Sequence, residues 1–171
     1  MIDRELGMDA GIASSLNDLG RIELALGSYE SAQELIAEGL ELHRRLGDQR
    51  GIALSLHNQG LVLLAWGRYD EARQRLTESL QLGHLRCLAD TLVGLAHLAL
   101  REEQLARAAR LYGAADQVNL QRKGILAFLE RRIHDDDLQQ LAETLGAELF
   151  EKAYTMGHTL TTEAVLLLAI S

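Results

Sequence analysis

Few residues in this sequence have the type and spacing that chemistry requires. His84 and Cys87 lie three positions apart, so on a helix they would offer an imidazole and a thiol to a metal ion. A structural zinc ion needs four such ligands, and no convincing third ligand accompanies this pair. We therefore predict a surface histidine, a half-buried cysteine and no metal site.

Three consecutive aspartates, Asp135–Asp137, are a second candidate for cation binding. They lack the alternating spacing of a calcium-binding loop. Asp136 and Gln139 instead have the spacing of a capping pair, and acidic side chains stabilise a helix N-terminus. The prediction is that a helix begins at these aspartates.

No motif for catalysis or nucleotide binding is present. The chain lacks the GxxxxGK[ST] phosphate loop and the HExxH and GxSxG motifs, and Glu130 and Glu163 have no positioned histidine or nucleophile. The net charge of −8 is unfavourable for binding a phosphate backbone and weakly favours a basic partner. We expect no enzyme activity, no cofactor and no direct contact with nucleic acid.

The cellular compartment follows from what the chain lacks. Its single cysteine, Cys87, cannot form an internal disulfide, and no secretory segment precedes the first helix pattern. The longest apolar run, Ala164–Ile170, is too short to span a bilayer. A cytoplasmic protein without a membrane role is predicted.

Evenly spaced glycines give the organisation of the chain. Gly7, Gly27, Gly47 and Gly67 are 20 residues apart, and there is no proline in the sequence. When residues 11–42 are compared with 51–82, 14 positions are identical. This pattern predicts a helix–turn–helix unit in tandem copies.

Each copy is expected to contain two helices joined at a glycine. The first helices cover 11–26 and 51–66, and the second helices begin at Tyr29 and Tyr69, with apolar residues every three or four positions. A weaker third copy has Glu103 in place of the turn glycine.

The predicted domains are a repeat region, 1–118, and a C-terminal helical cap, 119–171. The repeat region divides into a partial repeat 1–10 and repeats 11–50, 51–88 and 89–118. Because residues 1–7 match the end of a second helix, we expect a fragment of a longer array, with an apolar end that can dimerise. In the cap, one long helix or a broken pair of helices is expected over 125–145. Further helices are expected over 148–156 and 163–170, with Thr161 or Thr162 capping the last.

Leu16, Gly20, Gly27, Tyr29 and Ala32, with their counterparts in the second copy, resemble the tetratricopeptide repeat. The resemblance implies an all-α fold, a right-handed superhelical array of antiparallel helix pairs. The tail segments 106–116 and 145–168 resemble the C-terminal end of large bacterial LuxR-type and SARP-type ATP-dependent transcriptional regulators. In such proteins the DNA-binding and nucleotide-binding parts would lie upstream.

In this repeat family the first helices line a concave groove that binds ligands. Carrying those positions over predicts groove residues in each copy: Asn17, Asp18, Arg21, Leu54, His57, Asn58, Leu61, His97 and Arg101. Asn58 is expected to hold a peptide backbone through its amide, and Asn58→Ala to leave stability nearly intact. Trp66 is expected in the core, and the alternative is a place in the apolar middle of the groove.

These observations favour a non-catalytic protein-interaction or regulatory module that binds a protein or peptide segment in the groove. The module would be part of a transcriptional regulator and would act in signal transduction. Two alternatives stay open. One is an arm that restrains upstream domains of the same chain or forms a homodimer. The other is a sensor of a small-molecule inducer.

Overall fold

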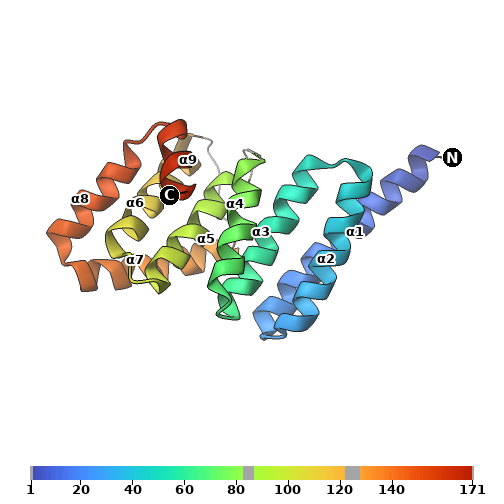
Figure 1. The fold of residues 1–171 in the computed structure, drawn as a ribbon, viewed down its shortest axis with the longest axis horizontal. Coiled ribbons are helices and arrows are strands. Elements are labelled where there is room, and N and C mark those ends of the chain that lie inside the picture. The colour runs from blue at the N-terminus through green and yellow to red at the C-terminus, as the bar shows by residue number, and fades with distance from the viewer. Residues whose placement is uncertain (1, 83–86, 122–127, 171) are drawn as a thin grey trace. The chain divides into compact units, whose positions relative to one another are not determined.

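The computed structural model describes residues 2–82, 87–121 and 128–170, and these form helices without any strand. They belong to two compact units, Met1–His84 and Leu85–Ser171, which we describe one at a time. The predicted all-α class is confirmed, and the helices pack as antiparallel pairs, α1–α2, α3–α4 and α5–α6 (Figure 1). His84 of the predicted His84–Cys87 pair lies outside the described residues.

The first unit contains two helix pairs, α1 (Ile2–Leu26) with α2 (Tyr29–Leu46) and α3 (Gln49–Ala65) with α4 (Tyr69–Gln81). Gly27 and Gly67, each with a φ of +79°, close the turn inside each pair. A left-handed backbone suits glycine because it has no Cβ. The predicted turns are therefore confirmed in both copies.

The second helix of each pair packs tightly against a glycine of the first. A Cβ added to Gly20 would lie 2.4 Å from Ile36 Cγ1, and one added to Gly60 would lie 2.6 Å from Leu76 Cγ. Ile36 and Leu76 are fully buried. This close approach is the reason that glycine occupies the middle of both first helices, despite its cost of about 1 kcal/mol relative to alanine.

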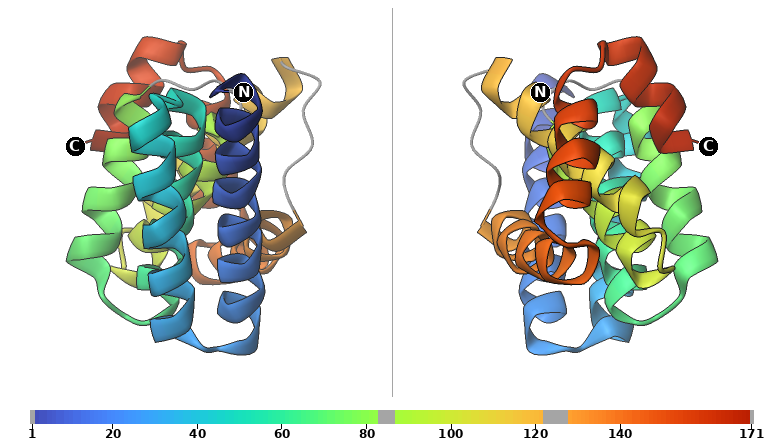
Figure 2. Two further views of the ribbon diagram at one scale, coloured as in Figure 1. Left: turned by 90° about the vertical axis from the view of Figure 1, so that its right-hand side faces the viewer. Right: turned by 90° about the vertical axis from the view of Figure 1, so that its left-hand side faces the viewer.

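The second unit contains α5 (Leu88–Arg101), α6 (Leu105–Gln121), α7 (Phe128–Leu145), α8 (Ala147–His158) and α9 (Thr162–Ile170). Helix α6 contacts the other four helices of the unit and lies alongside α8 in Figure 2. Glu103 has a φ of +62°, so the turn of the weaker copy keeps a left-handed residue without glycine. Thr161 Oγ1 accepts a 3.3 Å hydrogen bond from Ala164 N, which confirms one of the two predicted caps.

The prediction that a helix begins at the three aspartates is wrong. Asp135–Asp137 lie in the interior of α7. Tertiary contacts explain the difference, because Asp137 turns inward and binds Tyr112 on α6 and His97 on α5. The neighbouring Asp136 stays exposed.

Candidate functional site

The predicted groove residues of the first unit lie on α1 and α3, which pack against each other. Asn17 Nδ2 donates a 2.8 Å hydrogen bond to Ser55 Oγ, and Asn58 Nδ2 donates a 3.1 Å bond to Asn17 Oδ1. Arg21 Nη1 donates to Asn58 Oδ1 at 3.2 Å. Three of the predicted residues, Asn17, Arg21 and Asn58, are thus brought together in one chain of hydrogen bonds between two helices.

The other predicted residues of this unit differ in accessibility. Asp18 is exposed and Leu54 is half-buried, whereas His57 and Leu61 are buried. Arg21 is half-buried. We use the name α1–α3 face for the accessible residues Asp18, Arg21 and Leu54. Ligand binding by this face stays a prediction.

Two predicted residues belong to the second unit. His97 is half-buried on α5, and its Nδ1 lies 2.6 Å from Asp137 Oδ2 on α7. Arg101 is exposed at the last position of α5. His97 therefore has an internal partner that the spacing of the repeats did not indicate.

Burial of Asn58 changes the expected effect of its removal. Asn58 and Asn17 are each 1% exposed, so Asn58→Ala would leave Asn17 Oδ1 buried without its donor. We expect Asn58→Ala to lower the free energy of unfolding by about 1–3 kcal/mol. Asp18→Ala, on the accessible side of α1, should change it by less than about 0.5 kcal/mol. Urea unfolding of both variants would measure this, and equal stability would contradict a structural role for the asparagine pair.

A second accessible surface is the apolar face of α1. Met8, Ile12, Leu19 and Ile22 are 61%, 48%, 49% and 55% exposed. Their spacing puts them on one side of the helix, and several of them line a shallow hollow with Leu16. Exposed apolar patches usually mark contact surfaces.

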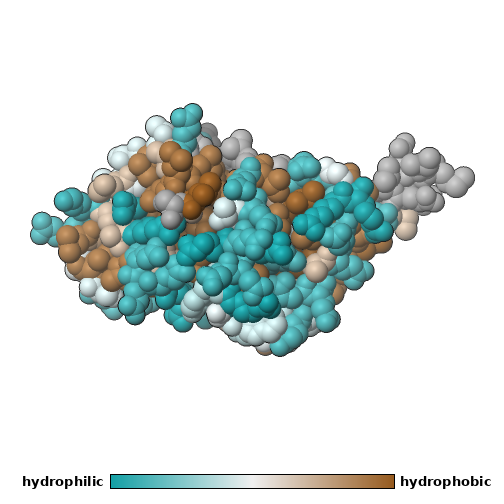
Figure 3. All heavy atoms as spheres, viewed as in Figure 1, coloured by the Kyte–Doolittle hydropathy of each residue, from teal (hydrophilic) through white to brown (hydrophobic). Residues whose placement is uncertain are grey.

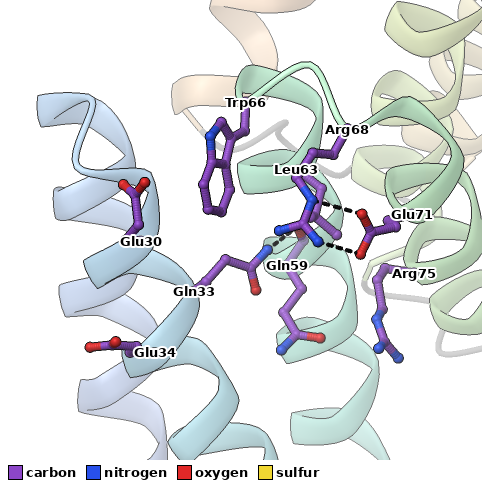
Figure 4. Close-up of a pocket in the computed structure, with 9 residues that line it drawn as sticks. All are labelled: Glu30, Gln33, Glu34, Gln59, Leu63, Trp66, Arg68, Glu71 and Arg75. Carbon is purple, nitrogen blue, oxygen red and sulfur yellow. Dashed lines mark hydrogen bonds and ion pairs between the residues drawn. The ribbon is translucent and has the colours of Figure 1, made fainter.

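A third surface is a pocket of about 320 Å³ between α2, α3 and α4, which we call the α2–α4 pocket (Figure 4). It is lined by Glu30, Gln33, Glu34, Gln59, Leu63, Trp66, Arg68, Glu71 and Arg75. None of these was a predicted site residue. The surface over α4 is largely hydrophilic in Figure 3.

Trp66 lines this pocket and is half-buried, so its expected place in the core is wrong. The Arg68 guanidinium carbon lies 4.9 Å from the centroid of the Trp66 ring, and Tyr29 lies against the same residue with ring centroids 6.2 Å apart. The sequence feature that could have indicated this pocket is a tryptophan directly before the turn glycine, where the first copy has Leu26.

In the second unit, two aspartates connect α6, α7 and α8, and Asp137 also pairs with His97 on α5. Asp137 on α7 accepts a hydrogen bond from Tyr112 on α6. Asp116 on α6 accepts one from Tyr154 on α8, and His134 Nε2 on α7 lies 3.1 Å from its Oδ2. Both carboxylates are occupied by internal partners, so we interpret these contacts as links between helices.

The same contacts shift several pKa values. Burial raises the pKa of the Asp116 carboxyl, but the hydrogen bonds from His134 and Tyr154 outweigh burial and bring it below its usual value. Burial lowers the pKa of His134, but contacts with Asp116 and Asp135 outweigh burial and raise it. Burial and then the neighbouring carboxylate raise the pKa of Tyr154. The environment thus favours an imidazolium and a neutral phenol against an ionised Asp116.

Two other kinds of functional feature are metal-binding clusters of side chains and membrane-spanning helices. Across residues 2–82, 87–121 and 128–170, no group of three or more His, Cys, Asp or Glu side chains is placed to hold a metal ion. None of the helices in this part of the chain combines the length and the apolar character needed to cross a membrane.

The two helix pairs of the first unit correspond to a known repeat. Residues 11–83 match the family described as tetratricopeptide repeat. No curated protein and no solved structure matched the sequence. The family match supports a tetratricopeptide-repeat domain over residues 11–83, a fold that is generally non-catalytic and serves protein–protein interaction.

Proposed function

We propose that this chain is a non-catalytic module that binds a protein or peptide segment on the α1–α3 face. The observation that carries the proposal is the hydrogen bond from Arg21 to Asn58, an amide that is itself held by Asn17. A guanidinium fixed in this way loses little freedom when it binds a carboxylate or carbonyl group. Asp18, exposed three positions earlier on α1, adds an acceptor beside it.

The proposal extends to the setting of the module. The tail segments 106–116 and 145–168 resemble the C-terminal end of bacterial LuxR-type and SARP-type transcriptional regulators, and this resemblance is the support for a regulator. The segment bound would then be a partner protein or an upstream domain of the same chain. The module would act in the cytoplasm.

Self-association is a second candidate, and the apolar face of α1 favours it. Met8, Ile12, Leu19 and Ile22 expose about half or more of their surface on one side of α1. A two-fold contact between two copies of this helix would remove that apolar surface from water. The chain would then form a homodimer through α1.

Site-specific photo-crosslinking can separate the two candidates. A photoreactive phenylalanine analogue would replace Asp18 on the α1–α3 face, Leu19 on the apolar face of α1, or exposed Gln74 on α4 as the control. Segment binding predicts adducts with a partner at position 18 and none at position 74. Self-association predicts adducts between two copies at position 19. Equal labelling at positions 18 and 74 would contradict binding on the α1–α3 face.

A further inference from the structure

We infer that the α2–α4 pocket binds the arginine or lysine side chain of a partner protein. This site lies between α2, α3 and α4, and its lining shares no residue with the α1–α3 face, so it goes beyond the proposed function. Three features of the pocket carry the inference: an unpaired buried acceptor, an excess of negative charge, and walls that exclude water from one side of an entering side chain.

The unpaired acceptor is Gln59 Oε1. Gln59 is 7% exposed, and its Oε1 is buried without a hydrogen-bond partner. In Figure 4 the side chain extends from α3 into the space between α2 and Arg75. A buried acceptor left unpaired costs about 1–3 kcal/mol, so an N–H donor that reaches it is strongly favoured.

The charge of the pocket is negative once the internal ion pairs are taken into account. Arg68 forms two hydrogen bonds with the Glu71 carboxylate, at 2.7 and 2.6 Å, and Arg75 pairs with Glu78 at 3.1 Å. Both arginines are therefore neutralised by residues of α4. Glu30 and Glu34 are the remaining charged residues of the lining.

The two glutamates are placed to act together. Glu30 and Glu34 lie four positions apart on α2, so their side chains share one side of the helix. Both residues are exposed at the rim, whereas Gln59 lies deep in the pocket. A cation held between α2 and α3 would have these carboxylates on the α2 side and the amide of Gln59 on the α3 side.

A basic side chain matches this combination of groups. An ammonium carries three N–H donors and a guanidinium five, so either can bind a carboxylate and still donate to Gln59 Oε1. Leu63 and Trp66 in the wall offer apolar surface to the methylene groups of the side chain. The net charge of −8 would draw a basic partner towards the chain.

Trp66 makes the inference directly measurable, because it is the single tryptophan of the chain and lines the pocket. The probe is the blocked tripeptide acetyl-Gly-Arg-Gly-amide, titrated at low salt into the full chain while Trp66 fluorescence is recorded. We expect a saturable change. The matched peptide with citrulline, which has the shape of arginine without its charge, should produce a much weaker change.

Variants locate the binding. Glu30→Gln/Glu34→Gln should weaken binding of the arginine peptide by about threefold to tenfold, as expected for the loss of two partly exposed ion pairs. The control Glu38→Gln/Glu41→Gln removes the same charge from exposed positions further along α2 and should leave the affinity unchanged. Gln59→Met should weaken binding without lowering the melting temperature, because the buried Oε1 that it removes has no internal hydrogen-bond partner.

Any one of several outcomes would overturn the inference. They are the absence of a saturable change with the arginine peptide, equal binding of the citrulline peptide, and equal weakening by the two double variants. Binding of acetyl-Gly-Glu-Gly-amide in preference to the arginine peptide would also overturn it, since Arg68 and Arg75 would then be the binding groups.

Discussion

Replacing Gly157 with alanine is expected to destabilise the second unit by about 3 kcal/mol or more. Gly157 lies on α8, and a Cβ added there would be 1.9 Å from the carbonyl oxygen of Arg110 on α6. The carbon and Cα of Arg110 would follow at 2.7 and 2.9 Å. These are backbone atoms, which cannot rotate away as a side chain can, so the two helices would have to separate.

The reciprocal contact makes this helix pair unusually sensitive. Gly113 on α6 faces α8, where an added Cβ would lie 2.1 Å from the carbonyl oxygen of Tyr154. Each helix therefore presents a glycine to the backbone of the other. If α8 moved to accommodate a methyl group at Gly157, the bond from Tyr154 to Asp116 would also be strained.

Gly11→Ala is the matched control, because a Cβ at Gly11 would meet nothing within 4 Å. Alanine in this helical position should stabilise the chain by about 0.5–1 kcal/mol. Thermal unfolding followed by circular dichroism would show opposite shifts for the two Gly→Ala variants. A melting temperature for Gly157→Ala at or above that of the native chain would contradict the close approach of α6 and α8.

The features that the sequence predicted well are those determined by neighbouring residues. The turns at Gly27 and Gly67 depend on glycine next to a helix-forming segment, and both were found with positive φ. Gly20 packs against Ile36 in the first copy as Gly60 packs against Leu76 in the second. Repetition in the sequence reveals such contacts because the same structural demand appears twice.

Contacts between residues that do not recur were missed. Asn17 and Asn58 bond across α1 and α3, but their counterparts in the other copy are His57 and Asp18, so the repeat gives no indication of this pair. Because Asn58 is buried, Asn58→Ala is expected to lower the free energy of unfolding, whereas the sequence alone suggested almost no change. The α2–α4 pocket was missed for a similar reason, since its lining comes from three helices and depends on which side chains find partners.

Asp137 is the plainest case of a residue whose role depends on distant partners, and its replacement has the second large effect we expect. Asp137→Ala should lower the free energy of unfolding by about 2–4 kcal/mol, because it leaves the Tyr112 hydroxyl buried without an acceptor. Tyr112 has no exposed surface, and burial followed by the Asp137 charge raises the pKa of its phenol, so it remains a donor. His97 would lose the same carboxylate, 2.6 Å from its Nδ1.

The adjacent aspartate provides the control. Asp136→Ala changes the same residue type on the exposed side of α7 and should alter stability by less than about 0.5 kcal/mol. A double-mutant cycle with Tyr112→Phe isolates the hydrogen bond, because Tyr112→Phe/Asp137→Ala no longer buries an unpaired hydroxyl. The double variant should therefore lose about 1 kcal/mol less than the sum of the single variants. If the effects of the two single variants on the free energy of unfolding were strictly additive, Asp137 would stabilise α7 without this bond. The link between α6 and α7 would then have to be assigned to Asp116 and His134 alone.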